Sequence, residues 1–277
     1  MRIDRTRYRA VVLALLGALA ACGDAARARD GVPADLLVTA RTGAITAPDS
    51  VRPGWTRMHV AEAEGKHIVV AFRLPATTTA TEVTTFVAAL DAAPATPPPG
   101  VAIGGPEIGA RGDVVVHLTP GLYVLACVRR GEDGHRHART GEFTVLHVRA
   151  ATPADSAFAA PPPTAQAVRL VDFAYVGPEH WAPGAQVLRL ENTGKQDHQL
   201  RLARLRVGAS LQAWMQADDP DAVATTVAGM ARVGPGEVAY LPVDLKPGTY
   251  VAYCLVADAS TQRPHVELGM LRAIQVP

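Results

Sequence analysis

The amino-acid sequence predicts an all-β protein made of two β-sandwich domains of the Greek-key type in tandem, each with one short helix. Short stretches in which apolar and other residues alternate recur at regular spacing, with Pro, Gly and Asn turns between them, as in β-sandwiches. The two halves of the chain also match each other segment by segment, which indicates an internal repeat. Helical patterns are confined to one short segment in each half, which favours an all-β class.

The first residues have the composition of a secretory signal. Four arginines within residues 2–9 precede an uncharged stretch at 11–21, which is too short to span a bilayer. The stretch ends in Leu-Ala-Ala-Cys at 19–22, which resembles a bacterial lipobox and implies cleavage before Cys22 and lipidation of its thiol. An ordinary signal peptide cut near Ala21 is the alternative. We expect a lipoprotein signal peptide over 1–22, a membrane anchor, and soluble domains that face the periplasm or the cell exterior.

Two segments have the composition of connectors between folded parts. Residues 23–36 are expected to form a short tether, and the Pro/Ala-rich residues 151–166 a linker. They leave stretches of ordinary domain size at 37–150 and 167–277. The 27 basic and 26 acidic residues include no basic block, so we expect no nucleic-acid partner.

The strand and helix patterns follow the same order in both halves. In "EVAYLPVDLKPGTYVAYCLV", every second residue from Ala239 to Leu245 is apolar, and a Pro-Gly turn leads into a second strand. The run "GDVVVHLTPGLYVLACV" repeats this hairpin in the first half. The helical segments are "TATEVTTFVAALDAA" in the first half and "SLQAWMQADD" in the second, where Ser210 has the residue type of an N-cap.

The repeat places a cysteine at the same point of each half. Cys127 and Cys254 each lie seven residues after the Pro of a Pro-Gly turn and four residues after a Tyr. An oxidising compartment would ordinarily pair two cysteines. Because these two occupy equivalent positions of separate domains, a disulfide would require both sites to meet across the linker. We therefore expect free thiols, either as metal ligands or as core residues.

Three segments of the second half carry residues that bind soft metals: "ENTGKQDHQL", "PGTYVAYC" and "PHVELGMLRAIQV". They resemble the cupredoxins, the blue-copper β-sandwiches, in which one His of an inner strand and a Cys, a His and a Met of the last loop bind copper. The resemblance implies one copper ion held by His198, Cys254, His265 and Met270. Ten residues separate the Cys from the second His, more than in small electron carriers but similar to the long loop of copper nitrite reductases.

The implied ligand set suits one-electron chemistry. A thiolate, two neutral imidazoles and a long thioether contact serve copper in both oxidation states, because soft sulfur favours Cu(I) while imidazole accepts both. The resemblance also implies that the edge of His265, near the surface, is the electron port. Gln199 stands where the family often has an Asn whose hydrogen bond ties the two ligand loops together, so the outer support of the site is left open.

The first half carries a weaker version of the same residue set, with an acidic residue in place of the Met. The candidate ligands are His67, Cys127, His137 and Glu142, and His135 lies nearby in the sequence. A carboxylate is a harder ligand than a thioether and favours Cu(II) or another borderline ion. The alternative is that this half is structural or presents the second half to a partner.

Catalytic motifs are missing from the sequence. Two-domain cupredoxin enzymes carry a His beside the copper-binding Cys, but here Tyr253 and Leu255 flank Cys254, and "HRH" is the only His-x-His. The residues beside Cys127 are apolar as well. Motifs of serine hydrolases, zinc proteases and phosphate-binding loops do not occur. We therefore predict that the chain is not an enzyme.

The sequence as a whole predicts an exported, lipid-anchored copper protein that passes single electrons to or from an envelope redox protein or another protein partner. A metal-free or copper-sequestering binding module on the same scaffold is the alternative. In that alternative Cys254 is a core residue, His265 lies in a surface loop, and Met270 packs under the last strand. Convergence of His198, Cys254 and His265 would favour the copper carrier.

Overall fold

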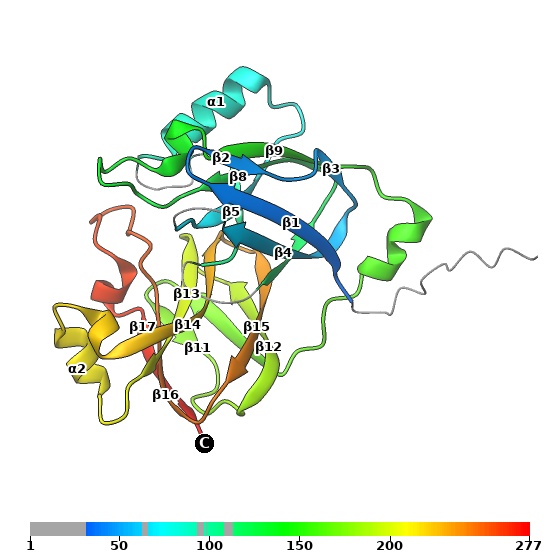
Figure 1. Ribbon diagram of the computed structural model, residues 1–277. Coiled ribbons are helices and arrows are strands. Elements are labelled where there is room, and N and C mark those ends of the chain that lie inside the picture. The colour runs from blue at the N-terminus through cyan, green and yellow to red at the C-terminus, as the bar shows by residue number, and fades with distance from the viewer. Residues whose placement is uncertain (1–31, 63–65, 93–96, 98, 108–112) are drawn as a thin grey trace, which may run out of the picture.

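The computed structural model describes residues 32–62, 66–92, 97, 99–107 and 113–277. The predicted signal peptide, the lipidation site Cys22 and most of the predicted tether lie outside the described residues. Figure 1 shows two β-sandwich lobes, one from each half of the chain, with α1 and α2 on the outside. The predicted all-β class, with one short α-helix in the described part of each half, is confirmed.

The described part of the first half alternates strands with one α-helix and one 3-10 turn. In chain order the elements are β1 (Ala34–Arg41), β2 (Ala44–Thr46), β3 (Ser50–Val51), β4 (Gly54–Glu62), β5 (Val69–Leu74), α1 (Ala80–Ala89), β6 (Val101–Gly104), β7 (Val114–Leu118), β8 (Gly121–Cys127), the turn η1 (His137–Thr140) and β9 (Phe143–Val148). The connection to the second half contains the 3-10 turn η2 (Pro153–Phe158).

The second half repeats this order, with β13, β14 and β15 longer than β5, β6 and β7. Its elements are β10 (Gln166–Val171), β11 (Ala174–Val176), β12 (Gly184–Asn192), β13 (His198–Leu205), α2 (Leu211–Gln216), η3 (Pro220–Ala222), β14 (Ala224–Val233), β15 (Val238–Leu245), β16 (Gly248–Tyr253), η4 (His265–Leu268) and β17 (Leu271–Val276). Strand β8 ends at Cys127 and β16 ends one residue before Cys254, so both cysteines lie at the end of equivalent strands, as the repeat predicts.

Both sheets run through both halves of the chain. One has the order β11-β10-β12-β15-β7-β4-β1-β2, and the other β17-β16-β13-β14-β6-β5-β8-β9-β3. The halves meet where β15 pairs with β7, opposing Ala239 to Val116, and where β14 meets β6, opposing Val233 to Ile103. Because these pairs satisfy strand edges that would otherwise be open, the two lobes are held together by backbone hydrogen bonds as well as by side chains.

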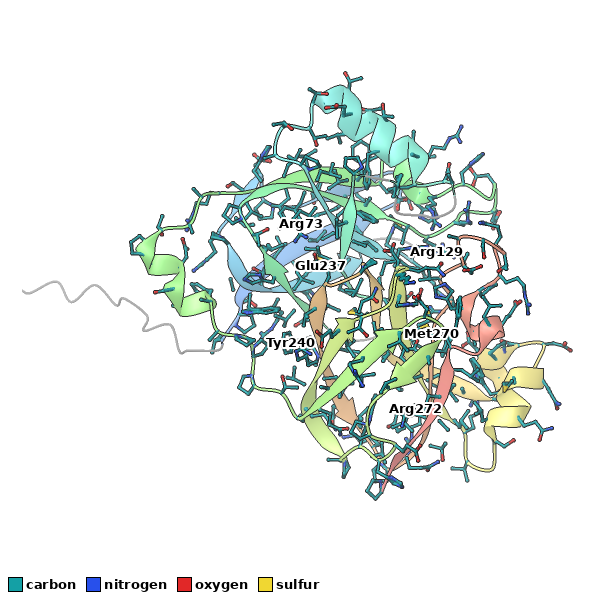
Figure 2. All side chains as sticks on the ribbon, turned by 180° about the vertical axis from the view of Figure 1, so that it is seen from behind. Arg73, Arg129, Glu237, Tyr240, Met270 and Arg272 are labelled. Carbon is teal, nitrogen blue, oxygen red and sulfur yellow. The ribbon has the colours of Figure 1, made fainter. Side chains whose placement is uncertain are left out.

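Side chains reinforce this junction. The guanidinium of Arg73 on β5 pairs with the carboxylate of Glu237, just before β15, at 2.5 Å, and Figure 2 labels both residues where the lobes meet. The ring of Trp55 on β4 contacts Tyr240 of β15 edge-on, with ring centres 4.9 Å apart. One hydrophobic core contains buried residues of both halves, including both cysteines.

The first domain begins earlier than predicted, and the predicted linker contains a 3-10 turn. Strand β1 begins at Ala34, inside the range predicted as tether, because Ala34 and Leu36 bury their side chains. The linker range contains η2, where the Asp155 carboxylate caps the turn and pairs with Arg149 at 2.7 Å. The linker therefore packs on the first half instead of running free.

Local capping explains the helices and the ends of the strands. Helix α1 begins with a capping box between Thr79 and Glu82, and the hydroxyl of Ser210 accepts from the N–H of Ala213 at 3.0 Å at the start of α2, as predicted. The hydroxyls of Tyr123 and Tyr250 each bond the backbone four residues upstream and fix the hairpin that leads to each cysteine. Within the described residues, no helix is long and apolar enough to cross a bilayer.

Candidate metal centre

The second sandwich brings the candidate ligands together through its backbone. His198 opens β13, Cys254 follows β16, His265 opens η4, and Met270 precedes β17. The N–H of Cys254 donates to the carbonyl of Met270 at 3.2 Å, and the N–H of Met270 donates to the carbonyl of His265 at 2.8 Å. Gly269 has φ 104°, a conformation that glycine adopts without strain. The ten-residue loop therefore returns to the strand from which it departs.

Three side chains converge at this point. The Nδ1 atoms of His198 and His265 lie 3.1 Å apart, and the Sγ of Cys254 lies 3.5 Å from Nδ1 of His265. All three residues are fully buried, and the side chain of Met270 is fully buried in the same core as the thiol. The burial of His265 departs from the alternative in which this residue lies in a surface loop, whereas a buried Met270 is compatible with both readings.

Asp172 fixes the orientation of the first imidazole. Its Oδ1 lies 3.0 Å from Nε2 of His198 and also accepts the N–H of Lys195 at 2.9 Å. Burial raises the pKa of this carboxyl, but the hydrogen bonds from Lys195 and His198 prevail and hold it below its ordinary value. An ionised carboxylate keeps the proton on Nε2, so Nδ1 of His198 presents its lone pair to the cluster.

The residues around Asp172 are shaped to hold this contact. A Cβ on Gly194 would lie 2.4 Å from Oδ1 of Asp172 and 2.7 Å from Nε2 of His198, so only glycine fits there. Phe173 follows Asp172 in the turn between β10 and β11 with φ 65°, an unfavourable conformation for an aromatic residue. Its ring meets that of His265 edge-on, with ring centres 5.2 Å apart. The strained turn thus contacts both imidazoles of the cluster.

Both imidazoles are held in the neutral form that binds metals. Burial lowers the pKa of His198, although Asp172 opposes the shift. Burial and the neighbouring His198 lower the pKa of His265 to about 4. The prediction that the edge of His265 reaches the surface is wrong, because the residue is fully buried. No described residue hydrogen-bonds its Nε2. Its ring packs against those of Phe173 and His198 instead.

The thiol of Cys254 is protonated at neutral pH unless a cation replaces the proton. Burial raises its pKa to about 12, although backbone N–H groups of Gln199 and Val256 oppose the shift. The N–H of Gln199 lies 3.5 Å from Sγ, and the side chain of Gln199 turns away to Glu107, 3.2 Å distant. This residue therefore supports the sulfur through its backbone. Cys127 and Cys254 are both free, as predicted.

The tie between the two ligand loops is made by Gln196 and Asp258, which the sequence analysis did not single out. The side-chain amide of Gln196 donates to Asp258 at 2.8 Å and accepts from the N–H of Ala259 at 3.0 Å. Asp258 also accepts the N–H and hydroxyl groups of Ser260 and Thr261. The Asp-Ala-Ser-Thr run is typical of a turn capped by a side chain, so the sequence does contain a signal for this turn.

The donor set of this cluster fits a copper ion. Two neutral imidazoles with converging Nδ1 atoms and one thiol surround a common point, and all their ligand atoms lie within 4.8 Å of one another. Nitrogen and sulfur donors of these kinds bind copper in both oxidation states. The carboxylate partner of His198 supplies the outer support that metal-binding imidazoles usually have.

The first sandwich assembles its candidate ligands around a carboxylate. Oε2 of Glu142 lies 2.8 Å from Nδ1 of His67 and 3.0 Å from Nδ1 of His137, and Oε1 accepts the N–H of Gly43 at 3.1 Å. The Sγ of Cys127 lies 3.9 Å from Nδ1 of His67. Burial raises the pKa of Glu142, but these hydrogen bonds outweigh burial and hold it below its ordinary value. The carboxylate therefore lies between the two imidazoles.

His135 does not belong to either cluster. Its exposed ring lies 3.1 Å from Oδ2 of Asp91, near the end of α1.

Burial raises the pKa of the Cys127 thiol to about 12, so this thiol is also protonated at neutral pH when no cation is present. The first cluster thus contains a protonated thiol and two imidazoles that share one anionic oxygen.

Comparisons with known proteins bear on the fold. No family model and no curated protein matches the chain. A dithionite-reduced auracyanin from the photosynthetic bacterium Roseiflexus castenholzii matches 40% of this chain and 94% of its own, with 19% identity and a TM-score of 0.29. The similarity is one of fold alone. Since identity and TM-score are this low, the choice of ligands depends on the side chains of this chain alone.

Two matches to copper enzymes correct a prediction from the sequence. A Cu-containing nitrite reductase from Thermus scotoductus covers 88% of this chain and 61% of its own, with 12% identity and a TM-score of 0.24. A multicopper oxidase covers 88% of both chains, with 14% identity and a TM-score of 0.25. The prediction that the chain is not an enzyme is contradicted by these matches.

Proposed function

We propose that the second sandwich binds one copper ion and uses it for one-electron transfer. The observation that carries the proposal is the convergence of His198, Cys254 and His265, with both Nδ1 atoms and Sγ facing a common buried point. Met270, which follows the same 3-10 turn, would supply the weak thioether ligand. When bound, copper would supply the Cu(I)/Cu(II) couple.

The residues that surround the ligands have separate tasks in this proposal. Asp172 holds the proton on Nε2 of His198 and leaves Nδ1 free to bind. The N–H of Gln199 stabilises negative charge on the sulfur of Cys254. Gln196 and Asp258 hold the two ligand loops in a fixed relation. A framework held this firmly would change little between oxidation states, so little reorganisation would oppose the transfer of an electron.

The place of action and the partner belong to the same proposal. The signal-like residues 1–22 and the lipobox ending at Cys22 support a lipid-anchored protein of the bacterial envelope. The described part offers two sandwiches that share continuous sheets, so the lobes would move as one body on the tether. We propose an envelope redox protein as the partner.

Copper sequestration is the second candidate function. It is favoured by the burial of His265, which leaves this imidazole no exposed edge through which a partner would reach the metal directly. A site enclosed in this way would retain copper well and exchange electrons more slowly. The same ligands serve both functions, so only redox behaviour separates them.

Reversible redox cycling tests the proposal. The full chain is loaded with one equivalent of Cu(II), reduced with ascorbate without oxygen, and reoxidised with ferricyanide while the visible spectrum is recorded. Electron transfer predicts loss and full recovery of the thiolate-to-copper absorption over repeated cycles. Retention of copper without reduction by ascorbate would favour sequestration, and failure to bind copper at all would contradict both candidates.

A further inference from the structure

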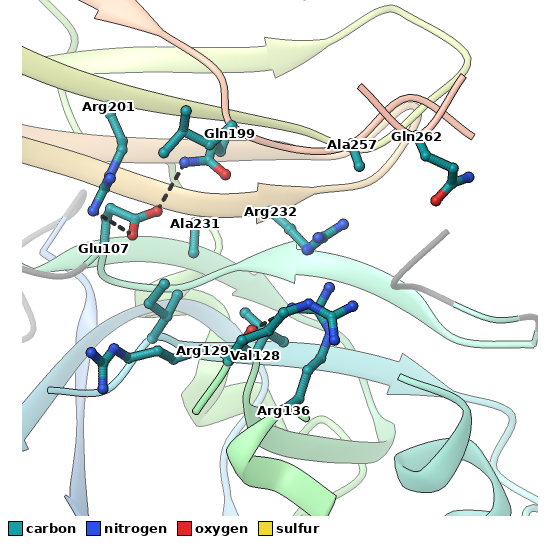
Figure 3. Close-up of a pocket in the computed structure, with 13 residues that line it drawn as sticks. Glu107, Val128, Arg129, Arg136, Gln199, Arg201, Ala231, Arg232, Ala257 and Gln262 are labelled. Atoms are coloured by element: carbon teal, nitrogen blue, oxygen red, sulfur yellow. Dashed lines mark hydrogen bonds and ion pairs between the residues drawn. The ribbon is translucent and has the colours of Figure 1, made fainter. Parts of the chain in front are cut away.

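A pocket lies at the junction of the two sandwiches, beside the loop that follows Cys254. Its volume is about 500 Å³, and residues of both halves line it, as Figure 3 shows. Leu255 and Ala257 of the Cys254–His265 loop form part of the wall. A pocket of this size suits a small organic molecule better than a single inorganic ion.

Arginines dominate the charge of this pocket. Its only acidic lining residue among the described residues is Glu107. The carboxylate of Glu107 is already engaged, since Oε1 lies 3.3 Å from the guanidinium of Arg201 and Oε2 accepts from Gln199 at 3.2 Å. The lining arginines are Arg129, Arg130, Arg136, Arg201 and Arg232. The pocket therefore carries a clear excess of positive charge.

Two of these arginines come from opposite halves and are almost fully buried. Arg136 is 9% exposed and Arg232 is 8% exposed, and Figure 3 shows both guanidinium groups on the same side of the pocket. Burial lowers the pKa of Arg136 to about 9, and Arg232 and Arg130 add to the shift by repulsion. Two like charges in a buried place are unfavourable unless an opposite charge lies near them.

The available protein groups compensate this charge only in part. The Arg136 side chain donates to the backbone carbonyls of Leu90 and Val128, which carry no net charge. The nearby carboxylate of Asp91 offsets part of its charge but also pairs with Arg139. Arg232 has the carboxylate of Asp197 at 3.7 Å, a distance longer than that of a strong ion pair. An anion in the pocket would lie close to both guanidinium groups and offset their repulsion.

We propose that this junction pocket binds a small molecule with several oxyanion groups, of the phosphate-ester or polycarboxylate class. Arg136 and Arg232 clamp one oxyanion group from opposite halves, because guanidinium groups bind phosphate and carboxylate oxygens in pairs. Arg129, whose guanidinium bonds no described residue, meets a second group. Binding would therefore strengthen the contact between the two halves.

Titration of the metal-free full chain tests this proposal without reference to copper. Pyrophosphate and citrate are titrated by calorimetry in a buffer with about 0.15 M chloride, which screens non-specific attraction to the surface. We expect saturable one-to-one binding of at least one probe. Tighter binding of pyrophosphate would indicate a phosphate ligand, and tighter binding of citrate a carboxylate ligand.

Substitutions locate the site. Arg232→Gln and Arg136→Gln should each weaken binding by about tenfold or more, the effect of one charge-assisted hydrogen-bonding group. Arg169→Gln, on the exposed face of β10, should leave binding unchanged. Because Arg136 also holds two backbone carbonyls, Arg129→Gln is the second variant should Arg136→Gln fail to fold, with a smaller but measurable loss expected. Absence of saturable binding, or equal losses in Arg169→Gln and Arg232→Gln, would overturn the proposal.

Discussion

The two sandwiches place their candidate ligands on equivalent strands and turns, and they differ in one residue of each cluster. In both halves a 3-10 turn begins at a His and ends at a Gly with positive φ, 105° at Gly141 and 104° at Gly269. The next residue is Glu142 in the first half and Met270 in the second. A single side chain after an equivalent turn therefore distinguishes the two clusters.

That difference decides whether the protein itself supplies a negative charge at the centre of the cluster. In the first half the two imidazoles share the anionic oxygen of Glu142, so the negative charge at the centre comes from the protein itself. In the second half the Nδ1 atoms of His198 and His265 face each other at 3.1 Å with no carboxylate between them. The first cluster contains its own anionic group, whereas the second contains two imidazole nitrogens and a thiol sulfur that a copper ion would join.

The largest expected effect separates the two thiols. Cys254→Ser should remove the intense thiolate-to-copper absorption of the copper-loaded chain almost completely, because oxygen does not replace the thiolate in that transition. Cys127→Ser is the matched control and should leave the absorption unchanged. Visible spectra of both variants at one equivalent of copper make the comparison. The opposite pattern would assign the copper to the first sandwich.

The next effect concerns the stability of the first sandwich. Glu142→Ala should lower the free energy of unfolding by about 3 kcal/mol, because it leaves buried N–H groups without an acceptor. Glu267→Ala in the second half removes an exposed carboxylate from its pair with Arg263 and should cost less than about 1 kcal/mol. Urea unfolding of the metal-free chain measures both. Equal losses in the two variants would show that Glu142 does not hold its cluster together.

The pH dependence of stability distinguishes the imidazoles of the second sandwich. Unfolded His265 takes up a proton near its ordinary pKa of 6.5, while burial lowers the folded pKa to about 4. The unfolded state thus binds more protons between these values, so stability should fall by about 2 kcal/mol from about pH 7.5 to pH 5.

Urea unfolding of the metal-free chain at several pH values measures this fall. The variant His265→Gln lacks the titrating group and should show a shallower dependence over the same range. A dependence that is the same in the variant and the parent chain would mean that His265 does not resist protonation in the folded state.

The smallest predicted effect tests the orientation of His198. Asp172→Asn should weaken copper binding by about tenfold, because the amide no longer fixes the proton on Nε2 as a carboxylate does. Asp218→Asn, an exposed position after α2, is the control and should leave the affinity unchanged. Competition with a chelator of known affinity measures both. Unchanged affinity in Asp172→Asn would show that this carboxylate does not orient His198 for copper binding.

The local features of the fold were predictable from the sequence, while its junction was not. The hairpins that end in Cys127 and Cys254, and the start of α2 at Ser210, follow from turn and capping residues within a few positions. The pairing of β15 with β7 joins segments more than 100 residues apart. No local pattern encodes such a pairing, because it depends on which strand edges remain open after each half has folded.

The same division holds for the candidate site. The residue types and spacing were enough to single out His198, Cys254 and His265, because the repeat and the family resemblance both mark those positions. Asp172 lies 26 residues before His198 in a separate hairpin, so no local pattern connects it to the cluster. The ring of His265 packs against Phe173, which also lies in that separate hairpin, so its burial has no local signal in the sequence either.

A copper titration distinguishes one copper site in the chain from two sites or none. Cu(II) is added stepwise to the metal-free full chain, and visible absorption and electron paramagnetic resonance are recorded at each step. We expect a thiolate-to-copper band that grows to one equivalent and then stops, because the carboxylate of Glu142 already lies between the two imidazoles of the first cluster. A band that grows to two equivalents, or the absence of any such band, would contradict this expectation.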